Sequence, residues 1–416
     1  MAKQCPRAGA CGAYQLNGVK YSTQLARKQA YVKSLLSCYG PVAPIIGMEN
    51  PFHYRNKVQS VFGVNAKGEV VNGIYRLGTH KLIPIRDCMI EDEEADAILE
   101  TVKALVKARG IEPYDEDRQV GAIRHVLIRR AVATDQSLVV IVSGSPKFRP
   151  KESFAQEIAR RHPSVKGVLL NVNTEKTSMV LSEAPCKLIW GQGWIEDELC
   201  GLRFRISAKS FYQVNATQAA KLYTIAMRMA MGRGGHFTGH ETVLDAYCGT
   251  GTIGLIAASC GVGRVIGIEL NESAVADAVE NATLNGLSNA TFLCGDASAV
   301  LKSMAKGHVW LSRGASESGS ALMGMDPETP ADYTQISNVD VLFLDPPRSG
   351  SDERFLSSVI KLSPQTVVYI SCNPQTLARD LRYLTTFGPY RMVGAQPVDM
   401  FPQTDSIETV VLLTHA

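Results

Sequence analysis

Several features are missing from this 416-residue chain, and each absence narrows its class. No apolar run approaches the roughly 18 to 20 residues of a membrane-spanning helix, so we expect no membrane partner. The first residues, MAKQCPRAGACG, also lack the apolar stretch of a secretory signal peptide, and the chain contains no internal repeat. We therefore expect a cytoplasmic protein whose ten cysteines are thiols or metal ligands rather than disulfides.

The net charge is only +3, but the basic residues are unevenly distributed. Residues 1–60 contain many lysines and arginines and a single acidic residue, Glu49. Further basic clusters lie at 124–130 and 147–151. Such patches attract a polyanion such as RNA, although the same pattern also fits a solvated basic face.

The chain is long enough for two or three domains, and its patterns divide it into three parts. Residues 1–40 form a basic, cysteine-containing segment with a helix, and residues 41–205 form an α+β region. From 206 to 416, apolar runs alternate with helical patterns, which predicts an α/β fold with a doubly wound, mostly parallel sheet. Residues 304–337 are rich in Gly, Ser and Ala and predict a mobile surface insertion.

A glycine-containing turn follows the first strand of the predicted α/β region, in VLDAYCGTGTIGL (243–255). Gly249 and Gly251 let the backbone approach a ligand at the carboxyl end of that strand. Glu269 ends the next strand, where a carboxylate can accept hydrogen bonds from ribose hydroxyls, and Asp296 follows the third. A glycine turn after the first strand, followed by acidic residues after the next two strands, favours a nucleoside-containing cofactor of the S-adenosylmethionine type. A nucleotide triphosphatase is disfavoured, whereas a dinucleotide or a turn without any ligand stays open.

Three further residues form a candidate catalytic set near strand ends: Asp345 in VLFLDPPRSG, Cys372 in YISCNPQTLARDL, and Glu408. Carbon 5 of uracil is a poor nucleophile until a thiolate adds at carbon 6, and the carbon 5 proton must later leave to a base. Cys372 and Glu408 would meet these needs, with Asp345 ordering the pocket. Two alternatives stay open: Cys372 is a structural strand-end thiol, or Asp345-Pro-Pro serves amino-group methylation, which needs no cysteine.

These motifs together resemble the RNA uracil-5-methyltransferase family. The resemblance rests on SAKSFYQVNATQAAKLY (207–223), LDAYCGTGTIGL, SCNPQTLARDL and DMFPQTDSIETVVLL. It implies that Cys372 is the nucleophile and Glu408 the base. It also implies that S-adenosylmethionine is the cofactor, with contacts from Gln213, Tyr247, Thr252, Glu269, Asp296 and Asp345.

The resemblance implies methylation of carbon 5 of a uridine in RNA, with 23S ribosomal RNA as the favoured substrate. Uridine 54 of transfer RNA, or a non-catalytic RNA-binding or assembly role, are the alternatives. We expect a monomer that binds RNA through the 41–205 region, with phosphate contacts from Arg27, Lys28, Lys33 and the 124–130 cluster.

The front of the chain departs from the family pattern. CPRAGACGAY is similar to the family's iron–sulfur segment: Cys5 and Cys11 match, and Cys88 stands where the fourth ligand is expected, but Tyr14 replaces the third cysteine. Three alternatives stay open: a cluster held by only three thiolates, a cluster in which Cys38 replaces the missing ligand, or a lost cluster. From the few residues before Cys5, we expect no β-barrel RNA-binding domain of the kind that some relatives carry. Ser406 replaces a histidine that many relatives carry two residues before the base.

Overall fold

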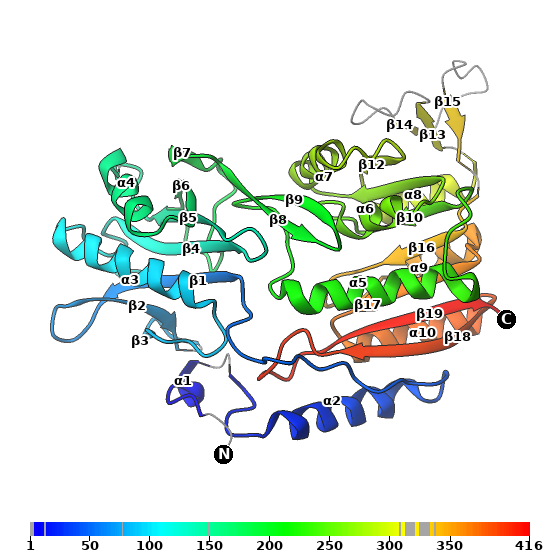
Figure 1. Ribbon diagram of the computed structural model, residues 1–416, viewed down its shortest axis with the longest axis horizontal. Coiled ribbons are helices and arrows are strands. Elements are labelled where there is room, and N and C mark those ends of the chain that lie inside the picture. Colours follow the sequence, from blue (N-terminus) through cyan, green and yellow to red (C-terminus); the bar gives the residue numbers. More distant parts are fainter. Residues whose placement is uncertain are drawn as a thin grey trace.

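The computed structural model describes residues 4–11, 14–76, 78–148, 150–307, 309–312, 321–323, 333–336 and 338–416. Two seven-stranded sheets dominate it and lie side by side, one built from the first half of the chain and one from the second (Figure 1). At the front, a short helix α1 (Ala8–Cys11) precedes the predicted helix, α2 (Tyr21–Leu36). α2 buries Val32 and Leu36 against the second sheet's core.

The first sheet has the strand order β3-β2-β1-β4-β5-β6-β7, antiparallel except for the β5–β6 pair. Its strands are β1 (Lys57–Val64), β2 (Val70–Tyr75), β3 (Leu82–Pro84), β4 (Ile123–Ala131), β5 (Gln136–Ser143), β6 (Val165–Val172) and β7 (Lys187–Gly191). Helices α3 (Glu93–Ala108) and α4 (Glu152–Arg161) pack on it through an apolar core that includes Phe62, Ile98 and Phe154. The predicted α+β character of this region is confirmed.

The second sheet has the order β12-β11-β10-β16-β17-β19-β18. Its strands are β10 (Thr242–Asp245), β11 (Arg264–Glu269), β12 (Ala290–Cys294), β16 (Val341–Leu344), β17 (Thr366–Ser371), β18 (Tyr390–Val398) and β19 (Glu408–His415). The first five in sheet order are parallel, while β19 is antiparallel to both β17 and β18. The predicted mostly parallel sheet is confirmed.

Helices cover both faces of this sheet. They are α5 (Ala216–Met231), α6 (Thr252–Ser259), α7 (Glu272–Leu284), α8 (Ala297–Met304), α9 (Glu353–Leu362) and α10 (Pro374–Phe387), with a short 3₁₀ turn at Gly232–Gly234. Successive residues of a strand point to opposite faces. Val243 accordingly belongs to the core shared with α5, α6 and α7, and Leu244 to the core shared with α8, α9, α10 and α2. The sheet is therefore doubly wound.

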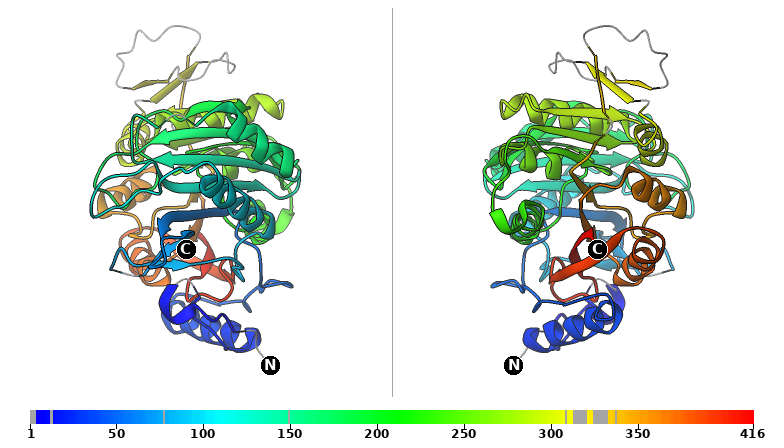
Figure 2. Two further views of the ribbon diagram at one scale, coloured as in Figure 1. Left: turned by 90° about the vertical axis from the view of Figure 1, so that its left-hand side faces the viewer. Right: turned by 90° about the vertical axis from the view of Figure 1, so that its right-hand side faces the viewer.

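A hairpin of β8 (Trp194–Leu199) and β9 (Leu202–Ser207) leads from the first sheet to α5. The predicted insertion at 304–337 lies largely outside the described residues. Its described part contains β13 (Val309–Ser312), β14 (Ala321–Met323) and β15 (Tyr333–Gln335), a small antiparallel sheet at the opposite end of the molecule from α2 (Figure 2). Within the described ranges, no helix has the length and apolar character needed to cross a membrane.

Candidate active site

The register of two antiparallel strands brings the candidate nucleophile and base together. β17 pairs with β19 so that Ser371 lies opposite Thr409. Cys372 directly follows the end of β17, and Glu408 is the first residue of β19, so this register brings the two close together, and the charge of Glu408 acts on the Cys372 thiol. A thiol and a carboxyl that are separated by the whole of α10 and β18 in the sequence thus share one site.

Burial leaves this site with three acidic groups that resist ionisation. Glu408 is 4% exposed, and its Oε2 has no hydrogen-bond partner within the described chain. Burial, followed by the charge of Asp345, raises the pKa of Glu408 well above its usual value. Burial also raises the pKa of Asp345, which follows the parallel strand β16, to about 7. The pKa of the Cys372 thiol is raised to about 11 by burial and by the charges of Glu408 and Asp345.

Two residues that the sequence did not single out belong to the same site. The exposed Arg348 follows Asp345-Pro-Pro, and its positive charge lowers the pKa of both Cys372 and Glu408. Tyr223, on α5, is 2% exposed and lies near Asp345 and Glu408, whose charges add to the effect of burial in raising its pKa. The Asp-Pro-Pro-Arg run could have suggested Arg348, whereas Tyr223 looks like an ordinary apolar-face residue of a helix.

The glycine-containing turn after β10 has the form of a cofactor loop. Gly251 has a φ of 81° and caps the amino end of α6, and a Cβ there would come within 2.9 Å of the Phe292 ring. Glu269 accepts hydrogen bonds from the backbone of Gly249 (3.1 Å) and Asn271 (2.9 Å), which fixes its carboxylate beside the turn. The predicted neighbourhood of Gly249, Gly251 and Glu269 is present.

Asp245, at the end of β10, supplies an independent sign of a ligand. Its Oδ2 accepts a hydrogen bond from the Gly254 backbone (2.9 Å), while its Oδ1 is buried with no partner among the described residues. Buried polar atoms are almost always paired, so an unpaired carboxylate oxygen beside a glycine turn fits a ligand that donates hydrogen bonds. The ammonium group of S-adenosylmethionine is such a donor.

The remaining predicted cofactor contacts lie around this turn. Gln213 is buried near Tyr223, and its backbone oxygen accepts from the Asn56 side chain (3.0 Å). Tyr247 packs on Phe355 with ring centroids 5.2 Å apart. The other two predicted contacts are Thr252, which begins α6 next to Thr250, and the exposed Asp296, which caps α8.

Four predicted RNA contacts are not available to RNA. Lys28 is 4% exposed and forms an ion pair with Asp399 (2.6 Å). Arg124 pairs with Glu116 (2.6 Å) and Arg130 with Asp92 (2.9 Å), while the buried Arg129 donates to backbone oxygens of the β9–α5 connection. The prediction is wrong for these residues because their charges are used inside the protein. Arg27 and Lys33 are exposed.

The loop that leads to Glu408 is held by α2. Tyr21 donates to Asp399 Oδ2 (2.8 Å), and Lys28 occupies Oδ1. The Gln24 side chain donates to the Gln403 side chain (2.7 Å), and the Gln403 backbone donates back to the Gln24 side chain (3.1 Å). Farther along this loop, the Ser406 backbone donates to the Thr404 hydroxyl (3.2 Å).

The front cysteines do not fit a four-thiolate cluster. Tyr14 is 4% exposed in an apolar cluster with Tyr54 and Ile90, against which Cys5 and Cys88 pack. Burial, then the charges of Cys5 and Cys88, raise the pKa of Tyr14 to about 12. In the parts of the chain that the structure describes, no group of three or more His, Cys, Asp or Glu side chains is placed to hold a metal ion.

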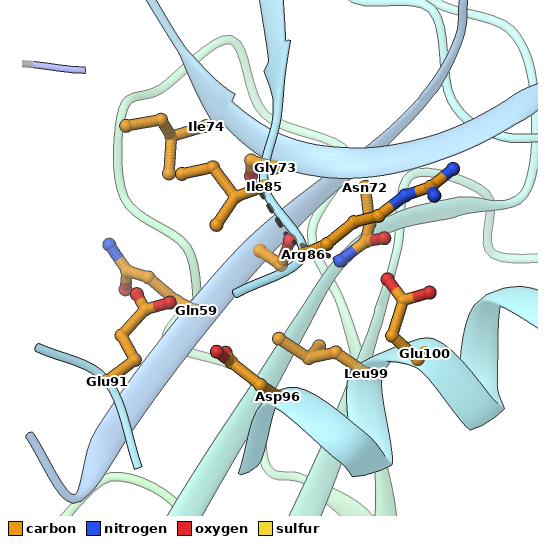
Figure 3. A pocket seen from close by; sticks show the side chains of 11 residues that line it. Gln59, Asn72, Gly73, Ile74, Ile85, Arg86, Glu91, Asp96, Leu99 and Glu100 are labelled. Carbon is orange, nitrogen blue, oxygen red and sulfur yellow. Dashed lines mark hydrogen bonds between the residues drawn. The ribbon is translucent and has the colours of Figure 1, made fainter. Parts of the chain in front are cut away.

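Cys88 lies in buried, acidic surroundings. Its backbone donates to Asp96 (3.0 Å), and Glu91 and Asp96 both line the small cavity between β2 and α3 in Figure 3. Burial and the charge of Glu91 raise the pKa of Cys88 to about 12. In the absence of a nearby cation, Cys88 is therefore a protonated thiol at neutral pH.

The chain is similar in sequence to RNA methyltransferases. The model of the tRNA (uracil-5-)-methyltransferase family matches residues 176–416. An uncharacterised RNA methyltransferase of Halalkalibacterium halodurans is 38% identical over 414 residues, which cover 98% of this chain and 82% of the relative. One from Bacillus cereus is 36% identical over 417 residues, covering 99% and 83%.

A solved structure shares the fold. Pyrococcus abyssi tRNA (uracil-54, C5)-methyltransferase in complex with S-adenosyl-L-homocysteine superposes with a TM-score of 0.70 at 22% sequence identity. The match covers 95% of this chain and 84% of that chain. The overall arrangement of both sheets is therefore one that is found in a methyltransferase.

Proposed function

The chain belongs to the tRNA (uracil-5-)-methyltransferase family of RNA methyltransferases, and from this we propose that it methylates carbon 5 of a uridine in RNA through a covalent adduct with Cys372. The observation that carries the proposal is the β17–β19 register, which brings Cys372 close to Glu408 at the edge of the sheet where Asp345 also lies. An amino-group methyltransferase has no use for a thiol at that position.

In the proposed chemistry Cys372 acts first and Glu408 second, while Asp345 has a positioning role. Cys372 gives its proton to solvent, and its thiolate forms a bond to carbon 6 of uracil. The π bond between carbons 5 and 6 breaks and leaves an enolate, which makes carbon 5 nucleophilic. Bound S-adenosylmethionine supplies the methyl group for carbon 5. Glu408 then takes the proton from carbon 5, the bond from sulfur to carbon 6 breaks, and the thiolate is released. Because the pKa of Glu408 is high, its carboxylate is a strong proton acceptor once it has ionised. Asp345 orders the pocket around the uracil.

We propose that the cofactor lies on the glycine-containing turn. Glu269 would accept from the ribose hydroxyls, and Asp245 Oδ1 from the ammonium group. Contacts from Gln213, Tyr247, Thr252, Asp296 and Asp345 complete the proposed set, which the residues around the turn support. We propose no iron–sulfur cluster, because Tyr14 fills the place of a ligand.

The 41–205 region is our proposed RNA-binding domain, preceding a methyltransferase domain at 206–416. Because the target base must leave its stack to reach Cys372, the uridine is expected in a single-stranded or flipped conformation. We propose 23S ribosomal RNA as the substrate. Uridine 54 of transfer RNA is the second candidate, since that base is named for the P. abyssi structure. Mapping 5-methyluridine in both RNAs, with and without the gene, decides between them.

The covalent step is tested with RNA that contains 5-fluorouridine. Fluorine cannot leave as a proton does, so the adduct with the wild-type protein should persist and add the mass of the RNA to the peptide that contains Cys372. Cys372→Ala should form no adduct. Glu408→Gln should accumulate the adduct even with ordinary uridine, because proton removal is blocked.

Cys38→Ala is the matched control, because Cys38 is an exposed thiol at the end of α2. It should form the adduct like the wild type. A Cys372→Ala protein that still methylates RNA would refute the covalent mechanism. A wild-type protein that binds RNA tightly but neither methylates it nor forms the adduct would support the non-catalytic alternative.

A further inference from the structure

A pair of like charges lies face to face in the first sheet. β1 and β4 are antiparallel, and their register sets Lys57 directly opposite Arg129. Like charges at such positions repel, and the sheet is less stable for it. Arg55, two residues before Lys57, adds a third positive charge: burial, Arg129 and then Arg55 lower the pKa of Lys57 to about 8.

The three cations differ in what balances them. Arg129 is buried and donates to the backbone oxygens of Ser207 and Ser210, and Asp277 attracts it from a longer distance. Glu91 acts on Arg55, also at a distance. Lys57 is partly buried, and in the described structure its ammonium has neither an ion pair nor a hydrogen bond. Lys57 is thus a desolvated cation without a partner anion.

The position of this cation connects it with the active site. Asn56, its neighbour, donates from its backbone to Val214 O (2.9 Å) and from its side chain to Gln213 O (3.0 Å). Gln213 in turn lies beside Tyr223, which is close to Asp345 and Glu408. The connection that Arg129 holds, Ser207 to Ser210, leads into the same segment. Lys57 therefore stands where the first sheet meets the catalytic edge of the second.

We propose that Lys57, supported by Arg55, binds a backbone phosphate of the RNA strand next to the uridine that enters the active site. A phosphodiester carries the negative charge that is missing beside Lys57, Arg55 and Arg129. Its binding would offset the repulsion between Lys57 and Arg129. This inference rests on the proposed function, because it needs an RNA whose uridine reaches Cys372. The residue is a binding residue and takes no part in the bond changes.

The test compares Lys57→Gln with the wild type in RNA binding and in methylation at a series of salt concentrations. Loss of one phosphate contact should reduce the slope of log K against log salt by about 0.7 and weaken binding roughly fivefold at physiological salt. KM for RNA should rise while kcat at saturating RNA stays unchanged. Lys57→Arg, which keeps the charge, should keep the slope.

Lys361→Gln is the control, because Lys361 is an exposed lysine in the last turn of α9. It should leave slope and KM unchanged. The melting temperature of Lys57→Gln without RNA should equal or exceed that of the wild type, since repulsion is removed. An unchanged salt slope, a fall in kcat alone, or a lower melting temperature would each overturn the proposal. If the wild type forms no 5-fluorouridine adduct while the slope still falls, the phosphate contact stands and the proposed chemistry fails.

Discussion

At the scale of single residues, the candidate site places two buried carboxyl groups around a thiol that must ionise. Burial, followed by the charges of Glu408 and Asp345, raises the pKa of Cys372, and the positive charge of Arg348 lowers it. The pKa of about 11 means that the thiolate fraction, and with it adduct formation, should increase with pH throughout the neutral range. Arg348 therefore controls how much thiolate is present at a given pH.

Replacing Arg348 by Met should move the pH profile of adduct formation to higher pH. Without the positive charge the pKa of Cys372 and of Glu408 rises further, so less thiolate is present at neutral pH. If the pKa of the thiol rises by one, the thiolate fraction at neutral pH falls about tenfold. The rate of adduct formation with 5-fluorouridine RNA, measured from pH 6 to about 10, checks this. Arg348→Lys, which keeps the positive charge, should have most of the wild-type rate of adduct formation. An unchanged pH profile in Arg348→Met would show that the charge of Arg348 does not lower the pKa of Cys372.

The catalytic candidates were predictable because their chemistry is tied to residue type. Cys372, Glu408 and Asp345 each stand beside a strand in a motif that suggests a role. Asp245 and Tyr223 were not identified, since a buried acid and a helix tyrosine gain meaning only from neighbours such as Gly254 and Glu408. The proximity of Cys372 and Glu408 depends on the pairing of β17 with β19, which sequence patterns do not give.

At the scale of secondary-structure elements, α2 shows why a basic helix is easily misinterpreted. Its cationic residues predicted an RNA-binding face, yet Lys28 points inward to Asp399, 371 residues later in the chain. The helix within residues 1–40 and the alternation of strands and helices after residue 206 were predicted, because apolar periodicity is local. The partner of a charged side chain is a long-range property, so the destination of Lys28 could not be predicted.

Lys28→Met should destabilise the protein by about 3–5 kcal/mol, because it leaves Asp399 buried without its cation. Urea-induced unfolding measures the loss. Lys28→Met combined with Asp399→Asn should recover part of it, since the buried charge is then gone. Both variants should lower kcat as well, because α2 holds the loop before Glu408. Arg27→Met, an exposed neighbour, is the control and should change neither quantity. A stable Lys28→Met protein would show that the pair contributes little.

At the scale of the whole molecule, apolar packing around Tyr14 joins the N-terminal segment to the region of the first sheet. The cluster around Tyr14 unites three distant segments: residues 5 and 8 at the front, Met48, Phe52 and Tyr54 before the first sheet, and Cys88 to Ile90 before α3. A metal cluster held by four cysteines would tie the same segments together. An aromatic ring at the third ligand position instead supplies apolar contact, so the junction should need no metal.

We therefore expect strong chelators to leave the melting temperature of the wild-type protein unchanged, and anaerobically purified protein to contain no stoichiometric iron. Tyr14→Ala should lower the free energy of unfolding by about 3 kcal/mol or more, because a fully packed ring is lost. Tyr14→Phe, which keeps the ring, should lose much less, and that difference identifies packing as the cause. Iron bound in a fixed ratio to the chain, together with a fall in melting temperature on chelation, would show instead that Cys5, Cys11 and Cys88 hold a cluster despite Tyr14.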